Sequence, residues 1–140
     1  MKRILVLCTG NSCRSQMAQG YLQHFAGNKA EVLSAGIETH GVNPKTIKVM
    51  KEDGIDISHH TSNNVSEYKN IDFDFVITVC DNANELCPVF ISSNPKTKKL
   101  HHNFPDPAKV KGSEEDILNE FRKVRDEIKG FCRDFIDLMN

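Results

Sequence analysis

The chain has 140 residues, 39% of them hydrophobic, and a formal net charge of −1, so it can form one domain with its own core. The balanced charge gives no indication of a nucleic acid or a membrane surface as a partner. No apolar run approaches the roughly 20 residues of a membrane-spanning helix, and no secretory signal is visible, so we expect a single cytoplasmic domain over residues 1–140, in monomeric form.

The first predicted element is a short apolar strand, Arg3–Leu7, which leads directly into Cys8. Its unbroken apolar character is typical of a buried parallel strand. A small polar loop follows, and helical spacing of apolar side chains begins at Arg14 and continues to about Phe25. Backbone N–H groups converge at such a helix start, where the helix dipole is positive, which favours binding of an oxyanion. The candidate oxyanion-binding residues are Thr9, Gly10, Asn11, Ser12, Cys13, Arg14 and Ser15.

The same electric field should lower the pKa of the Cys8 thiol and make it a thiolate nucleophile. Arg14 offers a planar fork of donors to two oxygens of an anion. Gly10 can adopt positive φ, and Asn11 tolerates it, while Ser15 can donate to the thiolate. The alternative is a buried cysteine at a strand end and a surface arginine, because a cysteine and an arginine at this spacing also occur by chance.

Strands and helices alternate along the rest of the chain. The pattern predicts a strand at Glu31–Gly36, a helix from Asn43-Pro44 to just before Gly54, and a loop at Asp56–Asn64. It then predicts a strand at Phe73–Val79 ending at Cys80, one helical turn at Asn82–Leu86, a weak strand at Lys98–His102 and a loop at Asn103–Pro107. The last predicted helix is capped by Ser113, and its apolar face consists of Ile117, Phe121, Val124, Ile128, Phe131 and Phe135.

This alternation predicts an α/β fold, a parallel sheet covered by helices on both faces. Ligands of such sheets bind beyond the carboxyl ends of the strands. Cys8 ends the first strand, Cys80 ends the third, and Asp106 follows the fourth. The topology therefore places these three reactive residues at one edge of the sheet.

Asp106 is a candidate general acid. It stands between Pro105 and Pro107, which stiffen the loop and restrict where the carboxyl group points. A carboxyl group that faces the thiolate can protonate a leaving oxygen. The alternative is an ordinary turn aspartate.

Cys80 and Cys87 form a second group of interest. They are too far apart in sequence for a C-x-x-C motif, but they can pair if the segment between them moves. They can also be two unrelated cysteines, or they can bind zinc with His101 or His102, although the spacing fits no standard zinc motif. Of the remaining cysteines, Cys13 is expected to pack inside the loop and Cys132 in the core.

The chain resembles the thioredoxin-coupled arsenate reductases, which share the fold of low-molecular-weight protein tyrosine phosphatases. The similarity spans nearly the whole chain and is carried by Leu7–Gln19 (LCTGNSCRSQMAQ), Ser34–Pro44, Asp56–Ser58 with Thr61-Ser62, and Arg122–Ile128. It implies a three-layer sandwich around a four-stranded parallel sheet in the order 2-1-3-4. It also implies arsenate as substrate and thioredoxin as partner, with Cys8, Arg14 and Asp106 at the oxyanion and electrons relayed through Cys8, Cys80 and Cys87, without a cofactor or a metal.

Two departures from the family pattern are visible. The phosphatases usually place two tyrosines after the Asp-Pro pair, where this chain has Ala108 and Lys109. Some reductases bind potassium through acidic residues that match Gln19 and Asn63, and because both are amides here, we expect weak or absent potassium binding even though Asn11, Ser34 and Thr61 remain.

Two other functions stay open at this point. A phosphatase would hydrolyse aryl phosphates through a phosphocysteine at Cys8. A non-catalytic module would only bind an oxyanion or arsenite, but binding alone does not need the proton donor Asp106.

Overall fold

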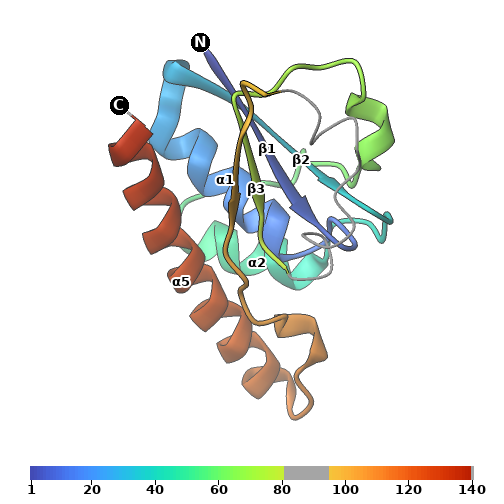
Figure 1. The fold of residues 1–140 in the computed structure, drawn as a ribbon. Helices are drawn as coiled ribbons and strands as arrows, with labels where there is room; N and C mark the ends of the chain where they lie inside the picture. The colour runs from blue at the N-terminus through green and yellow to red at the C-terminus, as the bar shows by residue number, and fades with distance from the viewer. Residues whose placement is uncertain (81–94, 140) are drawn as a thin grey trace.

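The computed structural model describes residues 1–80 and 95–139, which form a parallel four-stranded sheet with helices packed against it (Figure 1). The strands are β1 (Lys2–Cys8), β2 (Ala30–Gly36), β3 (Phe75–Thr78) and β4 (Lys98–His101). They lie in the order β2-β1-β3-β4, and every neighbouring pair is parallel. The predicted fold class and strand order are therefore confirmed.

The central strand β1 has neighbours on both edges, and its residues Ile4–Leu7 are fully buried. This explains its unbroken apolar sequence, because each face of a covered parallel sheet excludes water. The edge strand β4 carries the exposed side chains of Lys98 and Lys99, which protect a sheet edge from pairing with other chains.

Strand β3 is shorter than the predicted Phe73–Val79. The backbone at both ends still follows β1, since Asp74 donates to the Arg3 carbonyl at 2.9 Å and Val79 to the Leu7 carbonyl at 3.0 Å. The predicted turn at residues 82–86 lies outside the described residues.

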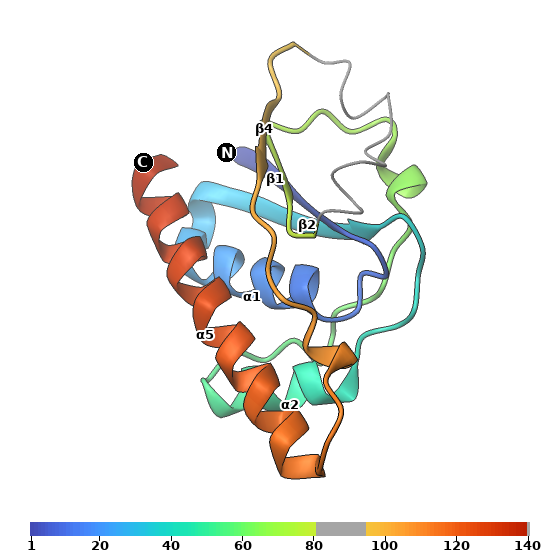
Figure 2. The same ribbon diagram turned by 60° about the horizontal axis from the view of Figure 1, so that its bottom comes forward.

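Helices α1 (Arg14–Ala26) and α5 (Glu114–Met139) cover one face of the sheet, and α2 (Pro44–Glu52) packs beside them. The short 3-10 helix η2 (Val65–Tyr68) lies on the other side of the sheet (Figure 2). Two further 3-10 turns, η1 (Gly27–Lys29) and η3 (Pro107–Lys109), precede β2 and α5.

Local sequence explains where two of the helices begin. The Asn43 side chain accepts a hydrogen bond from the Lys45 N–H, and Pro44 occupies the first turn of α2, as predicted. Ser113 and Asp116 exchange hydrogen bonds at the start of α5, each side chain accepting from the backbone of the other.

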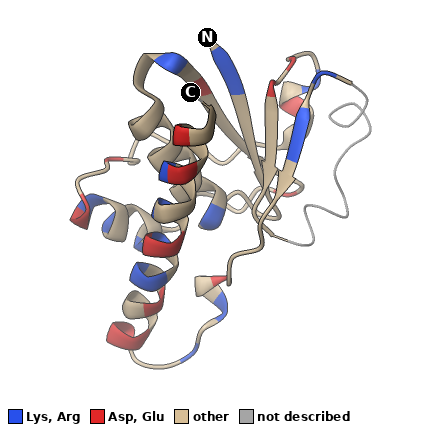
Figure 3. Ribbon diagram, turned by 60° about the vertical axis from the view of Figure 1, so that its left-hand side comes forward, with Lys and Arg blue, Asp and Glu red and all other residues tan. Residues whose placement is uncertain are grey.

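The apolar face of α5 faces the core over most of the predicted positions. Ile117 and Phe131 are only partly buried, and Leu118 and Ile136 are buried in addition. Acidic and basic residues are interspersed along the length of α5 (Figure 3). Within the described ranges, no helix is long and apolar enough to cross a membrane.

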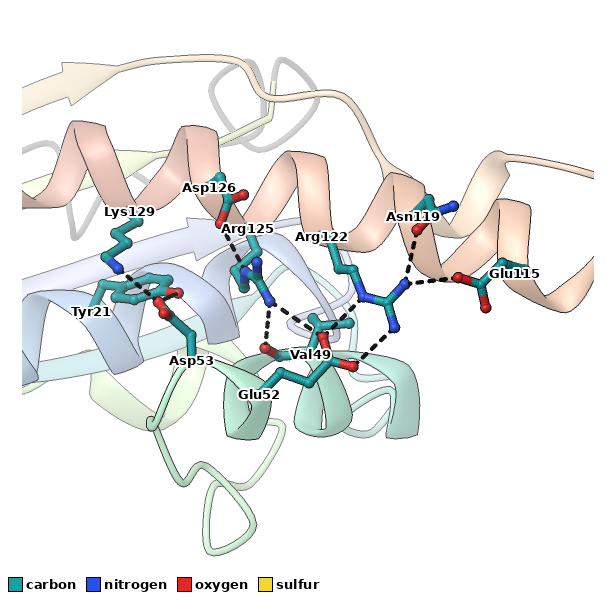
Figure 4. A network of polar contacts seen from close by, with 10 residues as sticks. All are labelled: Tyr21, Val49, Glu52, Asp53, Glu115, Asn119, Arg122, Arg125, Asp126 and Lys129. Atoms are coloured by element: carbon teal, nitrogen blue, oxygen red, sulfur yellow. Dashed lines mark hydrogen bonds and ion pairs between the residues drawn. The ribbon is translucent and has the colours of Figure 1, made fainter.

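A polar network joins α5 to α1 and α2 (Figure 4). Glu52 on α2 pairs with Arg122 at 2.9 Å and with Arg125 at 3.4 Å. The next residue, Asp53, accepts a hydrogen bond from the Tyr21 hydroxyl at 2.6 Å and pairs with Lys129 at 2.9 Å. Because Tyr21 lies on α1, the network holds the helix whose first residue is Arg14.

Candidate active site

The carboxyl ends of β1 and β3 and the loop after β4 enclose a cavity of about 640 Å³. Cys8, Cys80 and Asp106 all line it, as the strand order predicted. The other lining residues are Thr9, Gly10, Ser12, Cys13, Arg14, His40, Asn103, Phe104, Pro105, Ala108 and Lys109.

A clasp formed by residues 37–43 holds the loop after Cys8 from the outside. Backbone N–H groups of Ile37, Glu38, His40 and Asn43 donate to the carbonyl oxygens of Cys8, Thr9, Gly10 and Ser12 at 2.8–3.3 Å. Within the described part of the chain, no backbone N–H of residues 9–13 donates to a backbone carbonyl. The clasp therefore satisfies loop carbonyls, so the N–H groups of residues 10–13 do not compete for them and can face an anion.

Gly36 permits this close approach of the clasp. A Cβ atom at this position would lie 2.2 Å from the Glu38 carbonyl oxygen and 2.8 Å from that of Thr9. At Gly10 a Cβ would lie 2.7 Å from Nδ1 of His40, so the exposed His40 ring would have to move to admit it. Positive φ occurs at Asn11 (48°) rather than at Gly10, so only one of the two positions proposed from the sequence has it.

The Asn11 side chain fixes the loop from behind. Its Nδ2 donates to Ser15 Oγ at 2.8 Å and to Ser34 Oγ at 2.9 Å, and its Oδ1 accepts from the Asn63 N–H at 2.8 Å. Asn11 and Ser15 are fully buried and are not among the residues that line the cavity. Of the predicted oxyanion-binding set, these two shape the loop, while the other five line the cavity.

Gln16 and His60 add a second layer of support. Gln16 Nε2 donates to the carbonyl oxygens of Asn11 and Thr61, and its Oε1 accepts from His60 Nδ1 at 2.9 Å. Burial lowers the pKa of His60 to about 4, so the ring stays neutral at neutral pH. Sequence reasoning did not assign these two residues, because their roles depend on contacts between distant segments.

Arg14 reaches across the cavity to the loop that carries Asp106. One guanidinium nitrogen donates to the Phe104 carbonyl at 2.9 Å, and another lies 3.7 Å from Asp106 Oδ2. The Phe104 N–H donates to the Val79 carbonyl at 3.2 Å, which ties the same loop to the end of β3. The arginine, the acid and the Cys80 strand end are therefore held as one unit.

Cys8 and Cys80 lie side by side at the floor of the cavity. Both are buried, with 4% and 3% exposure, and the Cys80 thiol is near enough to raise the pKa of Cys8. Thr9 Oγ1 lies 3.2 Å from Cys80 Sγ. The two thiols are therefore neighbours in the lining of the cavity.

This contact corrects the prediction that the helix start makes Cys8 a thiolate. The hydrogen bond with Cys80 and then burial raise the pKa of Cys8, while Arg14 and the Thr9 N–H lower it. The raising effects outweigh the lowering ones, because a second thiol in a dry site opposes a neighbouring negative charge. The sequence predicted that Cys80 lies near Cys8, but it did not predict that Cys80 raises the pKa of Cys8.

The remaining cysteines divide into three cases. Cys13 lines the cavity and is buried, which raises its pKa. Cys132 is fully buried in α5 and packs in the core, as predicted. Cys87 lies outside the described residues.

The predicted potassium positions are joined to one another by hydrogen bonds. Gln19 Oε1 accepts from Ser34 Oγ at 2.6 Å, and Thr61 Oγ1 donates to Asn63 Oδ1 at 2.7 Å. Asn63 Nδ2 in turn donates to Glu67 Oε1 at 3.1 Å. Over residues 1–80 and 95–139, no group of three or more His, Cys, Asp or Glu side chains is arranged to hold a metal ion.

Comparison with known proteins agrees with this geometry. Residues 3–140 match the family described as low molecular weight phosphotyrosine protein phosphatase. The chain belongs to this family. It is similar to proteins named arsenate reductase 1 of Staphylococcus epidermidis (51% identity, covering 96% of this chain and 95% of that one) and arsenate reductase of Bacillus subtilis (45%, covering 97% and 96%).

The solved structures give the same result. The fold is similar to "An arsenate reductase in the phosphate binding state", with a TM-score of 0.84, 32% identity and full coverage of both chains. It also matches a structure titled as the YwlE arginine phosphatase, with a TM-score of 0.78, 22% identity and coverage of 99% of this chain and 95% of that one, which shows the common fold alone.

Replacing Cys80 should make Cys8 more acidic. In Cys80→Ala, the pH midpoint for alkylation of Cys8 by iodoacetamide, followed by mass spectrometry, should fall by about one pH unit or more, since the leading cause of the raised pKa is removed. Arg14→Gln should move the midpoint upward. An unchanged or higher midpoint in Cys80→Ala would contradict this interpretation of the thiol pair.

Potassium should have little effect on this protein. Because Gln19 and Asn63 are neutral and already hydrogen-bonded, exchanging about 0.1 M NaCl for KCl should change the melting temperature by less than about 1 °C. The matched control is Gln19→Glu, which restores a carboxylate and should make the melting temperature depend on potassium. Strong stabilisation of the unaltered protein by potassium would refute the prediction.

Proposed function

We propose that this protein reduces arsenate to arsenite, with thioredoxin as the source of electrons. The observation that carries the proposal is the second buried thiol, Cys80, beside Cys8 in the oxyanion cavity. Reduction needs a group that removes Cys8 from arsenic and supplies electrons, whereas phosphate hydrolysis needs none. The names of the relatives, which are 45% and 51% identical, support the same activity.

Binding of arsenate is the first step of the proposed reaction. The backbone N–H groups of residues 10–13 and the guanidinium of Arg14 hold the oxyanion in the cavity. Cys8 Sγ attacks arsenic while its proton passes to the Asp106 carboxylate, and Asp106 then gives this proton to the oxygen, which leaves as water. Asp106 lies 3.7 Å from Arg14, so the proposed proton donor is next to the side chain that would hold the oxyanion.

Electron transfer is the second step. Cys80 Sγ attacks Cys8 Sγ, the sulfur–arsenic bond breaks, and its electron pair stays on arsenic, which leaves as arsenite. The product on the protein is a disulfide between Cys8 and Cys80. The burial of both thiols in the lining of one cavity supports this step.

Recycling of Cys8 is the third step. The Cys87 thiolate attacks Cys80 Sγ, which frees Cys8 and leaves a disulfide between Cys80 and Cys87. Thioredoxin then reduces this disulfide with its own dithiol. The thiols supply both electrons, so the sequence of steps requires no metal or organic cofactor.

Phosphatase activity is the second candidate, because the family match and the set of Cys8, Arg14 and Asp106 serve phosphoryl transfer equally well. In that reaction Cys8 would carry a phosphoryl group and water would remove it. The cavity wall after Asp106 is formed by Ala108 and Lys109, which offer no aromatic surface to an aryl ring.

One assay separates the two activities. The full-length protein is given arsenate with thioredoxin, thioredoxin reductase and NADPH, and, in parallel, an aryl phosphate alone. We expect arsenate-dependent oxidation of NADPH over many turnovers and only slow release of phosphate. Fast hydrolysis of the aryl phosphate without arsenate-dependent NADPH oxidation would overturn the proposal.

Removing the Cys87 thiol should stop the recycling of Cys8 but not the first reduction of arsenate. In Cys87→Ser we expect about one arsenite per protein molecule, since Cys80 can still displace arsenite from Cys8 and form a disulfide with it, but no thiol then releases that disulfide. Mass spectrometry should find the Cys8–Cys80 bridge. Cys132→Ser is the matched control, because that thiol is buried in the core, and it should sustain many turnovers. Sustained turnover by Cys87→Ser would exclude the relay.

A further inference from the structure

We propose that the positive charge of Lys109 attracts a doubly charged oxyanion into the cavity and so assists its binding. The inference rests on the proposed function and names a residue that assists it before any bond is made. It follows from the balance of charges around the cavity and from the way η3 holds this lysine.

The charges deep in the cavity cancel each other. Arg14 lies 3.7 Å from Asp106 and donates to the Phe104 carbonyl, so its positive charge is already shared. The side chains of Arg14 and Asp106 are 12% and 23% exposed, which limits screening of this pair by water. An incoming dianion therefore meets a site whose two fixed charges are balanced.

His40 does not change this balance. Its Nε2 lies 2.9 Å from Glu38 Oε2, so any positive charge on the ring has an acidic partner beside it. Both side chains are mostly exposed. His40 and Glu38 together add no net positive charge at the rim when the ring is protonated.

Lys109 differs from the other cationic side chains of the wall. It lines the cavity, is exposed to solvent, and makes no ion pair with any acidic residue in the described part of the chain. Within the described part of the chain, it is therefore the cavity-lining cation whose positive charge no acidic side chain offsets.

The backbone fixes where this charge stands. The Lys109 N–H donates to the Asp106 carbonyl at 3.2 Å, and Asp106 Oδ1 accepts from the Ala108 N–H at 3.0 Å. Pro107, the first residue of this turn, is buried. The base of the lysine side chain is thus held three residues beyond the proposed proton donor, while the ammonium group remains free to meet an anion at the mouth.

A single cation at the mouth acts mainly on association. Attraction between an ammonium group and a dianion raises the local concentration of the anion, and salt weakens this effect. The chemical steps involve Cys8, Cys80 and Asp106 and do not need Lys109. Loss of the lysine should therefore lower kcat/KM for arsenate and leave kcat nearly unchanged.

The test compares the full-length protein with Lys109→Ala, Lys109→Glu and Lys109→Arg, and uses Lys111→Ala as the matched control. Lys111 is an exposed lysine two residues further on that is not among the cavity-lining residues. At about 20 mM ionic strength, Lys109→Ala should lower kcat/KM on the order of tenfold. Lys109→Glu should lower it further, and Lys109→Arg and Lys111→Ala should stay within about twofold of the unaltered protein.

The salt dependence of kcat/KM distinguishes an electrostatic role of Lys109 from a merely structural one. At about 0.5 M NaCl the deficit of Lys109→Ala should shrink to about twofold, because screening removes the advantage of the lysine. A deficit that persists unchanged at high salt, a fall in kcat that matches the fall in kcat/KM, or an equal loss in Lys111→Ala would each overturn the inference.

A binding measurement separates failure of this inference from failure of the proposed function. Inorganic phosphate should protect Cys8 from iodoacetamide, and Lys109→Ala should need on the order of tenfold more phosphate at low salt. If the unaltered protein does not reduce arsenate, the proposed function fails, and the protection experiment still decides the role of Lys109. Equal protection in both proteins would refute it.

Discussion

The site depends on the hydrogen bonds that residues 37–43 donate to the carbonyl oxygens of the loop after Cys8. A loop of this length has as many carbonyls as N–H groups, and an anion can be bound only if the carbonyls are engaged elsewhere. The clasp engages four of them from outside, at Cys8, Thr9, Gly10 and Ser12. Gly36 makes the approach possible, because any side chain there would collide with the backbone of both segments. The parallel pairing of β1 and β2 brings Gly36 beside Cys8 in register and so sets the position of the clasp.

The two thiols at the floor of this site restrain each other. The nearness of Cys80 and burial raise the pKa of Cys8, so Cys8 is made less reactive by the same residue that is proposed to form a disulfide with it. Arg14 and the Thr9 N–H oppose this effect, and an arsenate that engages Cys8 would remove the competition between the sulfurs. The arrangement favours reaction in the presence of an oxyanion over random oxidation of an exposed thiolate. Hydrolysis through a phosphocysteine gains nothing from such a pair, which is why the second thiol distinguishes the two candidate functions.

Much of the fold was predictable because its elements have strong local patterns. The buried run of β1, the Asn43-Pro44 start of α2 and the Ser113 start of α5 were predicted at or within a residue or two of their observed positions. The strand order was predicted through the family resemblance and is confirmed. The support of the loop by Gln16, His60 and Asn63 was not predicted, because it joins segments more than forty residues apart whose side chains show no periodic pattern.

The sequence by itself determined the alternation of strands and helices, and with it the edge of the sheet where Cys8, Cys80 and Asp106 gather, because parallel strands joined by helices present their carboxyl ends on one side. Only the tertiary structure decided the electrostatic state of that edge: the nearness of Cys8 to Cys80, the pairing of Arg14 with Asp106, and the charge of Lys109, which pairs with no acidic side chain among residues 1–80 and 95–139. The physical reason is that charge interactions and desolvation change steeply over a few ångströms, while sequence patterns specify which residues share an edge but not the distances between their atoms.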